Sequence, residues 1–355
     1  MPELAEFMSG LLSEEEKERA FAAEDIAYYN LVDGAIPLVE RLQVEDSRFV
    51  REVIVNSLKA LKAKQIVDNV LPLLRSDDAF LRNSAIDILV VQDESDMDSL
   101  RMLLHDPEKD VRKFVLDILV QLGTVYAVSL LTEALNDSDI NNVITAVEYL
   151  GRLDASASIN YINDVFNKTD NMLLRCTCLE TMSKIGNKQS MDYVALKYPD
   201  YQAIGGLEMY SFMKYLARKG SELHLPIVTQ LIVEKGEHMV KEIINALEGI
   251  LQRSEMEYLP NSLLEALDGY IDSDINEINK YELLILLSDY KNEEISSIIK
   301  KHLTSGNRMV CLGAVEGAGN YGNKEFESTL KELRENADDP ELLDAIEKSL
   351  RFLSS

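Results

Sequence analysis

Basic residues are scarce in this chain of 355 residues, since 36 Lys and Arg stand against 62 Asp and Glu for a formal net charge of −26. Nucleic acids and anionic membrane surfaces are both bound through clusters of Lys and Arg, so we expect neither as a partner. Tryptophan is absent, and the three cysteines form an odd count that favours a reducing compartment. No apolar run approaches the roughly 18 residues of a membrane span, and the first residues lack the features of a signal peptide. We therefore expect an acidic, cytoplasmic protein.

One stretch illustrates how the rest of the chain is organised. From Leu103 to Gly123 the sequence reads LLHDPEKDVRKFVLDILVQLG. An Asp-Pro turn separates the end of one helix from a second, in which apolar residues recur at helical spacing from Val111 to Leu122. Gly123 is the residue type that commonly caps a helix C-terminus. The stretch predicts two helices joined by a short turn.

Versions of this stretch recur along the chain. The Val-Arg or Leu-Arg step that opens the second helix ends at residues 51, 82 and 112, a spacing of 31 and then 30. The turn DSDIN at 137–141 returns letter for letter at 272–276, which favours duplication of a unit. A helix pair of this size cannot bury its apolar face alone, so neighbouring pairs must stack. We predict an all-α protein, an α–α superhelix of roughly nine or ten helix pairs.

The regularity of the repeats divides the chain into four segments. Residues 1–32 do not carry the repeat and are predicted to be N-terminal capping helices. Residues 33–186 hold the regular repeats, residues 187–222 a divergent and tyrosine-rich one, and residues 223–355 the C-terminal repeats. A divergent repeat within an array is a place where the curvature changes or where a partner binds.

The repeated unit resembles a HEAT repeat. It has a first helix with an internal proline, as in Ile36-Pro37-Leu38-Val39, then an Asp-containing turn, a Val-Arg step, and a second helix that ends in Leu-Gly. The period of ~30 residues is similar to that of the short subclass named after the phycobilisome lyases. The resemblance spans about residues 33–355 and implies an α-solenoid whose second helices line the concave side. It also implies a non-enzymatic interaction scaffold, with a bilin-lyase-like accessory protein that holds a small cofactor as the alternative.

An acidic residue in each inter-helix turn is followed by an arginine about one turn later. A row of arginines could bind a ligand. The preferred interpretation is structural, because a surface ion pair contributes only ~0–1 kcal/mol and turn acids commonly cap helices. Stacked copies would then form a ladder between neighbouring repeats. The pairs are Asp46 with Arg51, Asp78 with Arg82, and Asp106 with Arg112.

A second acidic position recurs five residues after the opening of the second helices. If these helices line a groove, the acids form a row that could bind a basic peptide or a Lys- and Arg-rich protein surface. The alternative is that they only solvate the helix, and Arg152, Lys184 and Arg351 at i+4 would neutralise part of the row. The residues are Asp87, Asp117, Glu148, Glu180, Glu282, Glu316 and Glu347.

Tyrosines concentrate in residues 193–215, together with Met209, Phe212 and Met213. They could form an aromatic binding patch that includes Tyr210. A stripe of Met and aromatic residues is more often core, so both interpretations stay open. The tyrosines are Tyr193, Tyr198, Tyr201, Tyr210 and Tyr215.

Motifs for catalysis, metals and cofactors are rejected on their spacing. The loop that begins at Asp272 starts like a calcium-binding EF-hand, but Glu277 replaces the glycine at its sixth position and Leu283 the glutamate at its twelfth. Cys176 and Cys178 point to different faces of a helix, and the four histidines are scattered. The His-Glu pairs of the HEAT-like di-iron hydroxylase are absent. Four glycines from Gly313 to Gly322 predict close helix packing followed by a C-cap, because no strand or Gly-Lys-Ser/Thr ending makes a phosphate loop.

These observations predict a scaffold or regulatory adaptor without enzymatic activity, cofactor or metal. Its partner is expected to be a protein with a basic surface or a basic peptide, bound along the concave, partly acidic groove.

Overall fold

The structure is a computed structural model that describes residues 2–61, 64–92, 98–200, 202 and 204–354. Within these ranges the chain is helical and contains no strand, as predicted. The helices of the described part are all too short or too polar to cross a membrane. The chain forms two compact units, Met1–Ile162 and Asn163–Ser355, whose boundary falls inside helix α11.

The first unit begins with a helix pair, α1 (Leu4–Leu11) and α2 (Glu16–Tyr28), which we call the capping pair after the role predicted for residues 1–32. Four helix pairs follow, and the first helices α5 and α9 each continue into a 3₁₀ turn. The pairs are α3 (Ala35–Val44) with α4 (Arg48–Ala60), α5 (Lys64–Val70) with α6 (Ala79–Leu89), α7 (Asp98–Leu103) with α8 (Lys109–Leu122), and α9 (Val125–Glu133) with α10 (Ile140–Arg152).

Six further pairs begin with α11, in which the second unit starts. They are α11 (Ile159–Lys168) with α12 (Met172–Ile185), α13 (Lys188–Lys197) with α14 (Gly206–Lys219), α15 (Leu225–Lys235) with α16 (Val240–Arg253), α17 (Asn261–Asp272) with α18 (Glu277–Ser288), α19 (Glu293–Leu303) with α20 (Arg308–Tyr321), and α21 (Phe326–Asn336) with α22 (Pro340–Ser354). The described helices α3 to α22 therefore make ten pairs, in agreement with the nine or ten predicted.

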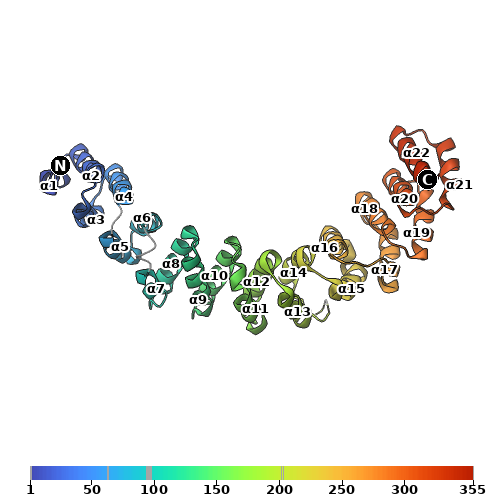
Figure 1. The fold of residues 1–355 in the computed structure, drawn as a ribbon, viewed down its shortest axis with the longest axis horizontal. Helices are drawn as coiled ribbons and strands as arrows, with labels where there is room; N and C mark the ends of the chain where they lie inside the picture. The colour runs from blue at the N-terminus through green and yellow to red at the C-terminus, as the bar shows by residue number, and fades with distance from the viewer. Residues whose placement is uncertain (1, 62–63, 93–97, 201, 203, 355) are drawn as a thin grey trace. The chain divides into compact units, whose positions relative to one another are not determined.

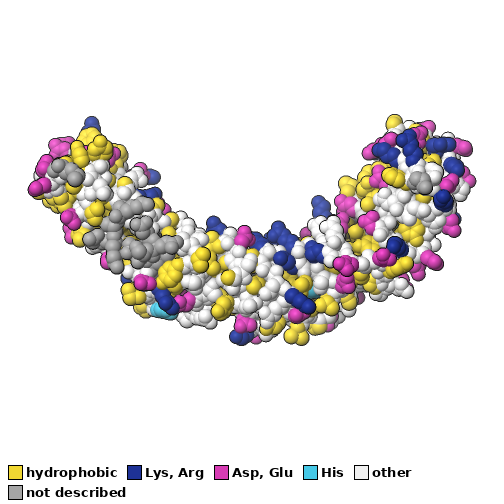
Figure 2. Space-filling view, viewed as in Figure 1, with side chains coloured by type: hydrophobic (Ala, Val, Ile, Leu, Met, Phe, Trp, Pro, Cys, Tyr) yellow, Lys and Arg dark blue, Asp and Glu magenta, His cyan; other side chains and the backbone are white. Residues whose placement is uncertain are grey.

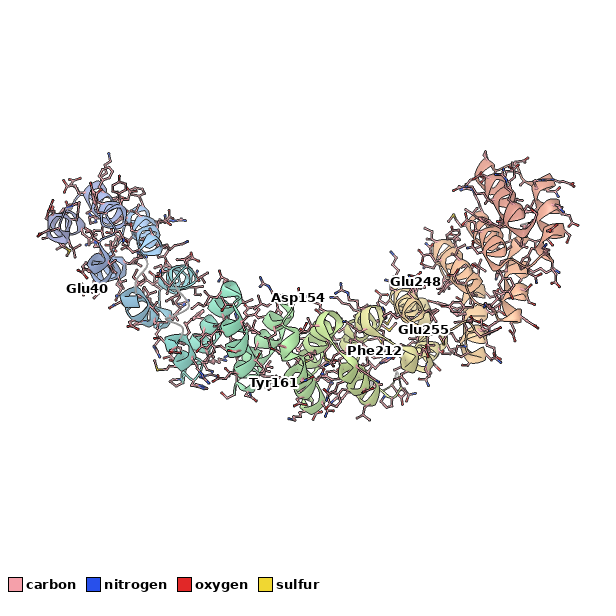
Figure 3. All side chains as sticks on the ribbon, viewed as in Figure 1. Glu40, Asp154, Tyr161, Phe212, Glu248 and Glu255 are labelled. Atoms are coloured by element: carbon pink, nitrogen blue, oxygen red, sulfur yellow. The ribbon has the colours of Figure 1, made fainter. Side chains whose placement is uncertain are left out.

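Each unit has two layers of helices. The odd-numbered helices form one layer and the even-numbered helices the other, which we call the second-helix layer (Figure 1). Within each unit, taken by itself, the second-helix layer lies on the concave side (Figure 1). The core lies between the layers, as Figure 3 illustrates with Phe212, whose side chain is fully buried.

Helix α8 confirms the periodicity predicted for residues 103–123. Its residues Val111, Val115, Ile118 and Leu119 are all at most 1% exposed. Gly123 caps the helix with a φ of 61°, a left-handed conformation that favours glycine.

Arginines near the start of the second helices join consecutive repeats, as predicted. Arg112 donates to the backbone oxygen of Asp106 in its own turn and to both carboxylate oxygens of Asp137 in the next turn, at 2.7 and 2.8 Å. Arg51 binds Asp78 in the same way at 2.9 Å.

Three details of this ladder differ from the prediction. Arg51 donates to the backbone oxygen of Glu45 and forms no ion pair with Asp46 among the described residues. Arg82 donates only to the carbonyls of Ser76 and Asp77 and lies over the ring of Phe114. The carboxylate of Asp106 is bound by Arg75 instead. The ladder between repeats accounts for these arginines, and ligand binding is not needed to explain them.

Glycines allow second helices to approach each other closely. A Cβ at Gly249 of α16 would lie 2.0 Å from the backbone oxygen of Ala217 in α14. A Cβ at Gly313 would lie 2.9 Å from Tyr281 Cα, and Gly322 caps α20 with a φ of 76°. The glycines from Gly313 to Gly322 thus provide the close packing and the cap that the sequence predicted.

The DSDIN turns and the divergent segment differ from what the sequence suggested. The two DSDIN turns are not in the same register, because Asp139 caps α10 whereas Asn276, two letters later in the motif, caps α18. The divergent segment 187–222 forms an ordinary helix pair, α13 and α14. The boundary between the two compact units lies before this segment, and the four-part division of the repeats stays a prediction.

The carboxylate of Glu45, after α3, is the most strongly held acid of the first unit. It is fully buried and accepts hydrogen bonds from Arg19 of the capping pair at 2.8 Å, from the Ser47 amide at 2.9 Å and from Arg41 at 2.8 Å. Burial alone would raise the pKa of Glu45, but these donors lower it to about 2.

We predict that acid destabilises the first unit through Glu45. The pKa of the group is lower in the folded than in the unfolded state, so its stabilisation is present above pH 4.5 and is lost as the pH falls toward 2. A shift of this size corresponds to roughly 3 kcal/mol of unfolding free energy. Urea unfolding between pH 7 and 2 should show this slope, and E45Q should flatten it. E52Q removes only an exposed ion pair with Arg48 and should keep the slope; an equal slope in E45Q and the wild type would contradict the prediction.

We also predict opposite effects for two glycine-to-alanine substitutions. G249A should lower the free energy of unfolding by about 2–3 kcal/mol, because the new methyl group meets backbone that cannot move away without separating α14 from α16. G269A lies inside α17 with no atom within 4 Å of the new methyl group, so it should stabilise by about 0.5–1 kcal/mol. Urea denaturation measures both, and a neutral G249A would disprove the close contact.

Candidate functional site

The predicted acidic row lies on the second-helix layer. Asp87, Glu148, Glu180, Glu282 and Glu347 are exposed, while Asp117 and Glu316 are half-buried. Each lies on a different second helix: α6, α8, α10, α12, α18, α20 and α22. The structure therefore places every predicted acid on the same layer, although not in equivalent surroundings.

Two residues at this position were missed. Glu180 lies six residues before Gly186, the C-cap of α12. Counted the same way from Gly220 and Ser254, the caps of α14 and α16, the equivalent residues are Lys214 and Glu248. These helices lack the Val-Arg step from which the position of each acid was counted in the sequence. Their C-caps identify the equivalent position instead. The row in the second unit thus contains a base and an additional acid, and Figure 3 shows Glu248 on the second-helix layer.

In the first unit, two of the acids share a hollow. Asp87 and Asp117 line a cavity of about 480 Å³ together with Tyr149 and Arg152. Asp117 accepts a hydrogen bond from the Tyr149 hydroxyl of the next second helix and forms an ion pair with Lys113 at 2.5 Å. Its charge is therefore partly neutralised within the protein. Glu148 forms no ion pair with Arg152, whose guanidinium lies over the Tyr149 ring.

Two acids in the second unit have basic partners. Lys214 lies 3.7 Å from Glu180 on the neighbouring helix, and Arg351 lies 3.6 Å from Glu347 one turn along α22. Lys and Arg side chains also appear between the Asp and Glu side chains along the inner edge of this unit (Figure 2). The second-helix layer therefore carries a mixed charge.

Glu248, Glu282 and Glu316, on the consecutive second helices α16, α18 and α20, form what we call the acidic patch. Among the described residues, no Lys or Arg forms an ion pair with any of the three. Burial and the charge of Glu282 raise the pKa of Glu248. Glu316 accepts a hydrogen bond from the Tyr281 hydroxyl, and this bond, with burial, raises the pKa of Tyr281 to about 12. Within the acidic patch the charge of Glu282 thus acts on Glu248, whereas Glu316 lies within range of the charge of Lys348.

Most of the predicted aromatic patch belongs to the core. Tyr198, Phe212, Met213 and Tyr215 are at most 4% exposed. Tyr210 is 56% exposed and lies on α14 one turn before Lys214. Tyr193 on α13 is half-buried, and its hydroxyl accepts a hydrogen bond from Gln189. Tyr201 lies outside the described residues. Tyr210 is therefore the most exposed candidate for an aromatic contact among these described tyrosines.

The cysteines have no disulfide partner. Cys178 and Cys311 are buried, whereas Cys176 is only half-buried. Burial raises the pKa of the Cys176 thiol, with Glu208 and Glu180 adding to the effect. These are the properties of unreactive thiols.

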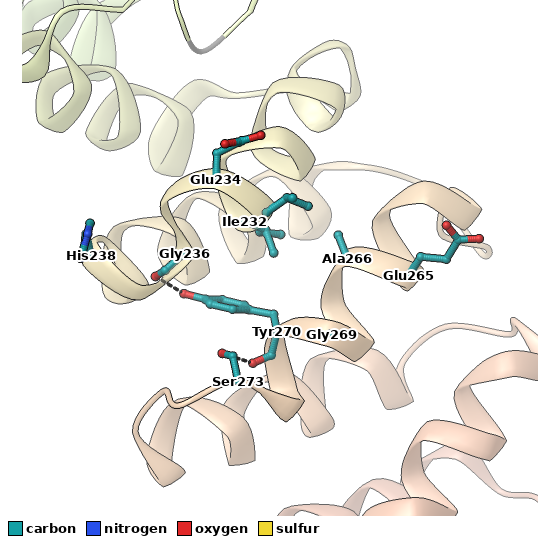
Figure 4. A pocket seen from close by; sticks show the side chains of 10 residues that line it. Ile232, Glu234, Gly236, His238, Glu265, Ala266, Gly269, Tyr270 and Ser273 are labelled. Atoms are coloured by element: carbon teal, nitrogen blue, oxygen red, sulfur yellow. Dashed lines mark hydrogen bonds between the residues drawn. The ribbon is translucent and has the colours of Figure 1, made fainter.

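Hollows also occur between first helices. One of about 460 Å³ lies between α15 and α17, with Glu234 and Glu265 at its sides and Tyr270 across it (Figure 4). The Tyr270 hydroxyl donates to the backbone oxygen of Gly236 at 2.7 Å, which ties the two repeats together. The polar groups of this hollow thus serve the packing.

A larger hollow of about 590 Å³ lies at the ends of the second helices α12, α14 and α16. Its cations cap helix C-termini, since Lys219 donates to the Gly186 carbonyl and Arg253 to three carbonyls at the end of α14.

One group of side chains has the composition of a metal site. Asp268 and Asp272 of α17 and His302 of α19 place their ligand atoms within 4.8 Å of one another. No metal was expected from the sequence, because residues of α17 and α19 that meet only when the repeats stack give no short motif.

Comparison with known proteins agrees with the repeat architecture. A family model for HEAT repeats matches residues 97–183, which correspond to α7 through most of α12. No curated protein matches the chain. Residues 97–183 therefore contain HEAT repeats, and the described helix pairs on either side of them continue the same α-solenoid architecture.

Solved structures offer distant similarities. The Escherichia coli protein YibA is 17% identical with a TM-score of 0.47, covering 78% of this chain and 98% of its own. Kap95p, in its complex with RanGDP, is 12% identical with a TM-score of 0.49, covering 99% of this chain and 55% of its own. Human deoxyhypusine hydroxylase, in complex with glycerol, is 17% identical with a TM-score of 0.32, covering 74% and 96%.

Proposed function

We propose that the chain is a non-enzymatic interaction scaffold of the cytoplasm that binds a Lys- and Arg-rich segment of a partner protein on the acidic patch. HEAT-repeat arrays present extended surfaces that commonly bind other proteins. Asp87 and Asp117 offer a second, smaller acidic surface in the first unit, and Tyr210 an aromatic contact on α14.

The observation that carries the proposal is that, among the described residues, Glu248, Glu282 and Glu316 have no Lys or Arg ion-pair partner, whereas Glu180 and Glu347 have one. The pKa of Glu248 is raised by burial and by the charge of Glu282, so ionisation of this carboxyl is costly in the free protein. A bound cation relieves this cost, whereas the ion pairs of Glu180 and Glu347 are already satisfied within the chain. Acids at equivalent positions on different second helices thus differ in whether their charge is available to a partner.

Binding of this kind depends on ionic strength. The patch lies at the surface, where charges are screened over about 8 Å at physiological salt. Attraction between the acidic patch and a basic segment mainly accelerates association, so the affinity should fall as salt is added.

We predict that neutralising the patch weakens binding of a basic peptide. The probe is a fluorescent twelve-residue peptide of alternating Lys and Arg, titrated with the full chain and followed by anisotropy. The triple variant E248Q/E282Q/E316Q should bind it at least about tenfold more weakly, as expected for the loss of several charge contacts.

A matched control separates the patch from the overall charge, since a chain of net charge −26 attracts any polycation. E265Q/E332Q/E335Q removes the same charge from exposed positions on the first helices α17 and α21 and should bind like the wild type. Equal weakening in both triple variants, or no binding by the wild type, would refute the proposal.

A further inference from the structure

Two carboxylates and an imidazole meet on the first-helix layer of the second unit. Asp268 and Asp272 are four residues apart on α17, so they lie on the same face of that helix. His302 belongs to α19, the first helix of the next repeat, and Nε2 of its ring lies 3.7 Å from Oδ1 of Asp272. All three ligand atoms lie within 4.8 Å of one another.

The imidazole nitrogen of His302 lacks a hydrogen-bond partner although it is buried. His302 is 8% exposed, and its Nε2 is one of three buried side-chain polar atoms without a partner among the described residues. The other two, on Tyr215 and His224, belong to rings that pack against each other with centroids 6.3 Å apart. The His302 nitrogen instead lies 3.7 Å from a carboxylate oxygen of Asp272. A buried nitrogen without a protein partner at such a place is explained by a bound ion or an ordered water.

The donor set favours zinc over magnesium and calcium. Zn²⁺ accepts imidazole and carboxylate ligands at roughly 2.0–2.2 Å in tetrahedral geometry, which puts neighbouring ligand atoms about 3.4 Å apart. The 3.7 Å between Asp272 and His302 is close to this value. Magnesium and calcium prefer all-oxygen sets, and the group contains no thiolate for softer metals.

The ammonium group of Lys301 competes with a metal ion for the two carboxylates. Its ammonium lies 3.3 Å from the Asp268 carboxylate and also contacts Asp272, so it neutralises the charge that a metal would neutralise. The Lys301 side chain is 46% exposed and can turn into solvent when a metal enters. Asp272 is exposed as well, which leaves a path to the site.

We propose that Asp268, Asp272 and His302 bind one Zn²⁺, with water as the fourth ligand. The ion links α17 to α19 and thereby ties two consecutive repeats together in the layer opposite the acidic patch. The site is independent of the proposed partner binding, because it shares no residue with the acidic patch.

The test is calorimetric titration of the full chain with zinc chloride after dialysis against a chelator. The wild type should bind zinc at a site that raises its melting temperature. D272N should lose at least about tenfold in affinity, since replacement even of an outer-sphere partner commonly costs that much. Asp272 is exposed, so this variant should fold; H302Q, whose side chain is buried, should show the same loss provided its circular dichroism is unchanged.

Three further measurements make the assignment specific. K301Q should bind zinc more tightly, because the competing ammonium is gone. H105Q removes an exposed histidine that lies 3.0 Å from Glu133, and it should bind like the wild type. Co²⁺ in place of zinc should give the intense visible absorption of a four-coordinate ion in the wild type and not in D272N. No zinc binding by the wild type, or wild-type affinity in D272N, would overturn the proposal.

Discussion

No helix pair of this protein can bury its apolar face alone, and the rest of the structure follows from that constraint. The second helices meet so closely that Gly249 of α16 leaves no room for a side chain beside Ala217 of α14. Such contact requires small residues at fixed positions along each helix. It also leaves the opposite face of every second helix open to solvent, where the acidic row lies. Packing therefore determines which face of each second helix carries the charged side chains. The residue at each position then determines the sign of the charge and whether it forms an ion pair.

Polar bonds keep the stacked repeats in register. The apolar contact between layers is not directional, but the guanidinium of Arg112 reaches its own turn and the carboxylate of Asp137 in the next. Both side chains are largely buried, so a slip of one repeat would leave two charges without partners. Glu45 does the same for the capping pair through Arg19.

Local features of the sequence predicted the architecture, and long-range pairing limited the prediction of the site. The apolar period of α8 and its cap at Gly123 involve neighbours in sequence and were correct. The short spacing of the glycines in α20 correctly predicted close helix packing, although their contacts lie on neighbouring repeats. Glu248 and Lys214 were missed because their helices lack the Val-Arg step. The partner choice of Arg82 and the meeting of Asp268 with His302 depend on which repeats stack, and no local spacing contains that information.

The arginine ladder has a consequence for how the array can change in length. Arg112 pairs with Asp137, the acid of the following inter-helix turn. A deletion preserves pairing of this kind only if it removes whole repeats, because the arginine before the deletion then meets the turn carboxylate of the repeat after it. A deletion that begins or ends within a repeat leaves one member of such an arginine–aspartate pair without its partner. Growth or shortening by complete modules is then the natural mode of variation, and a truncated fragment is best ended beyond the turn that receives its last arginine.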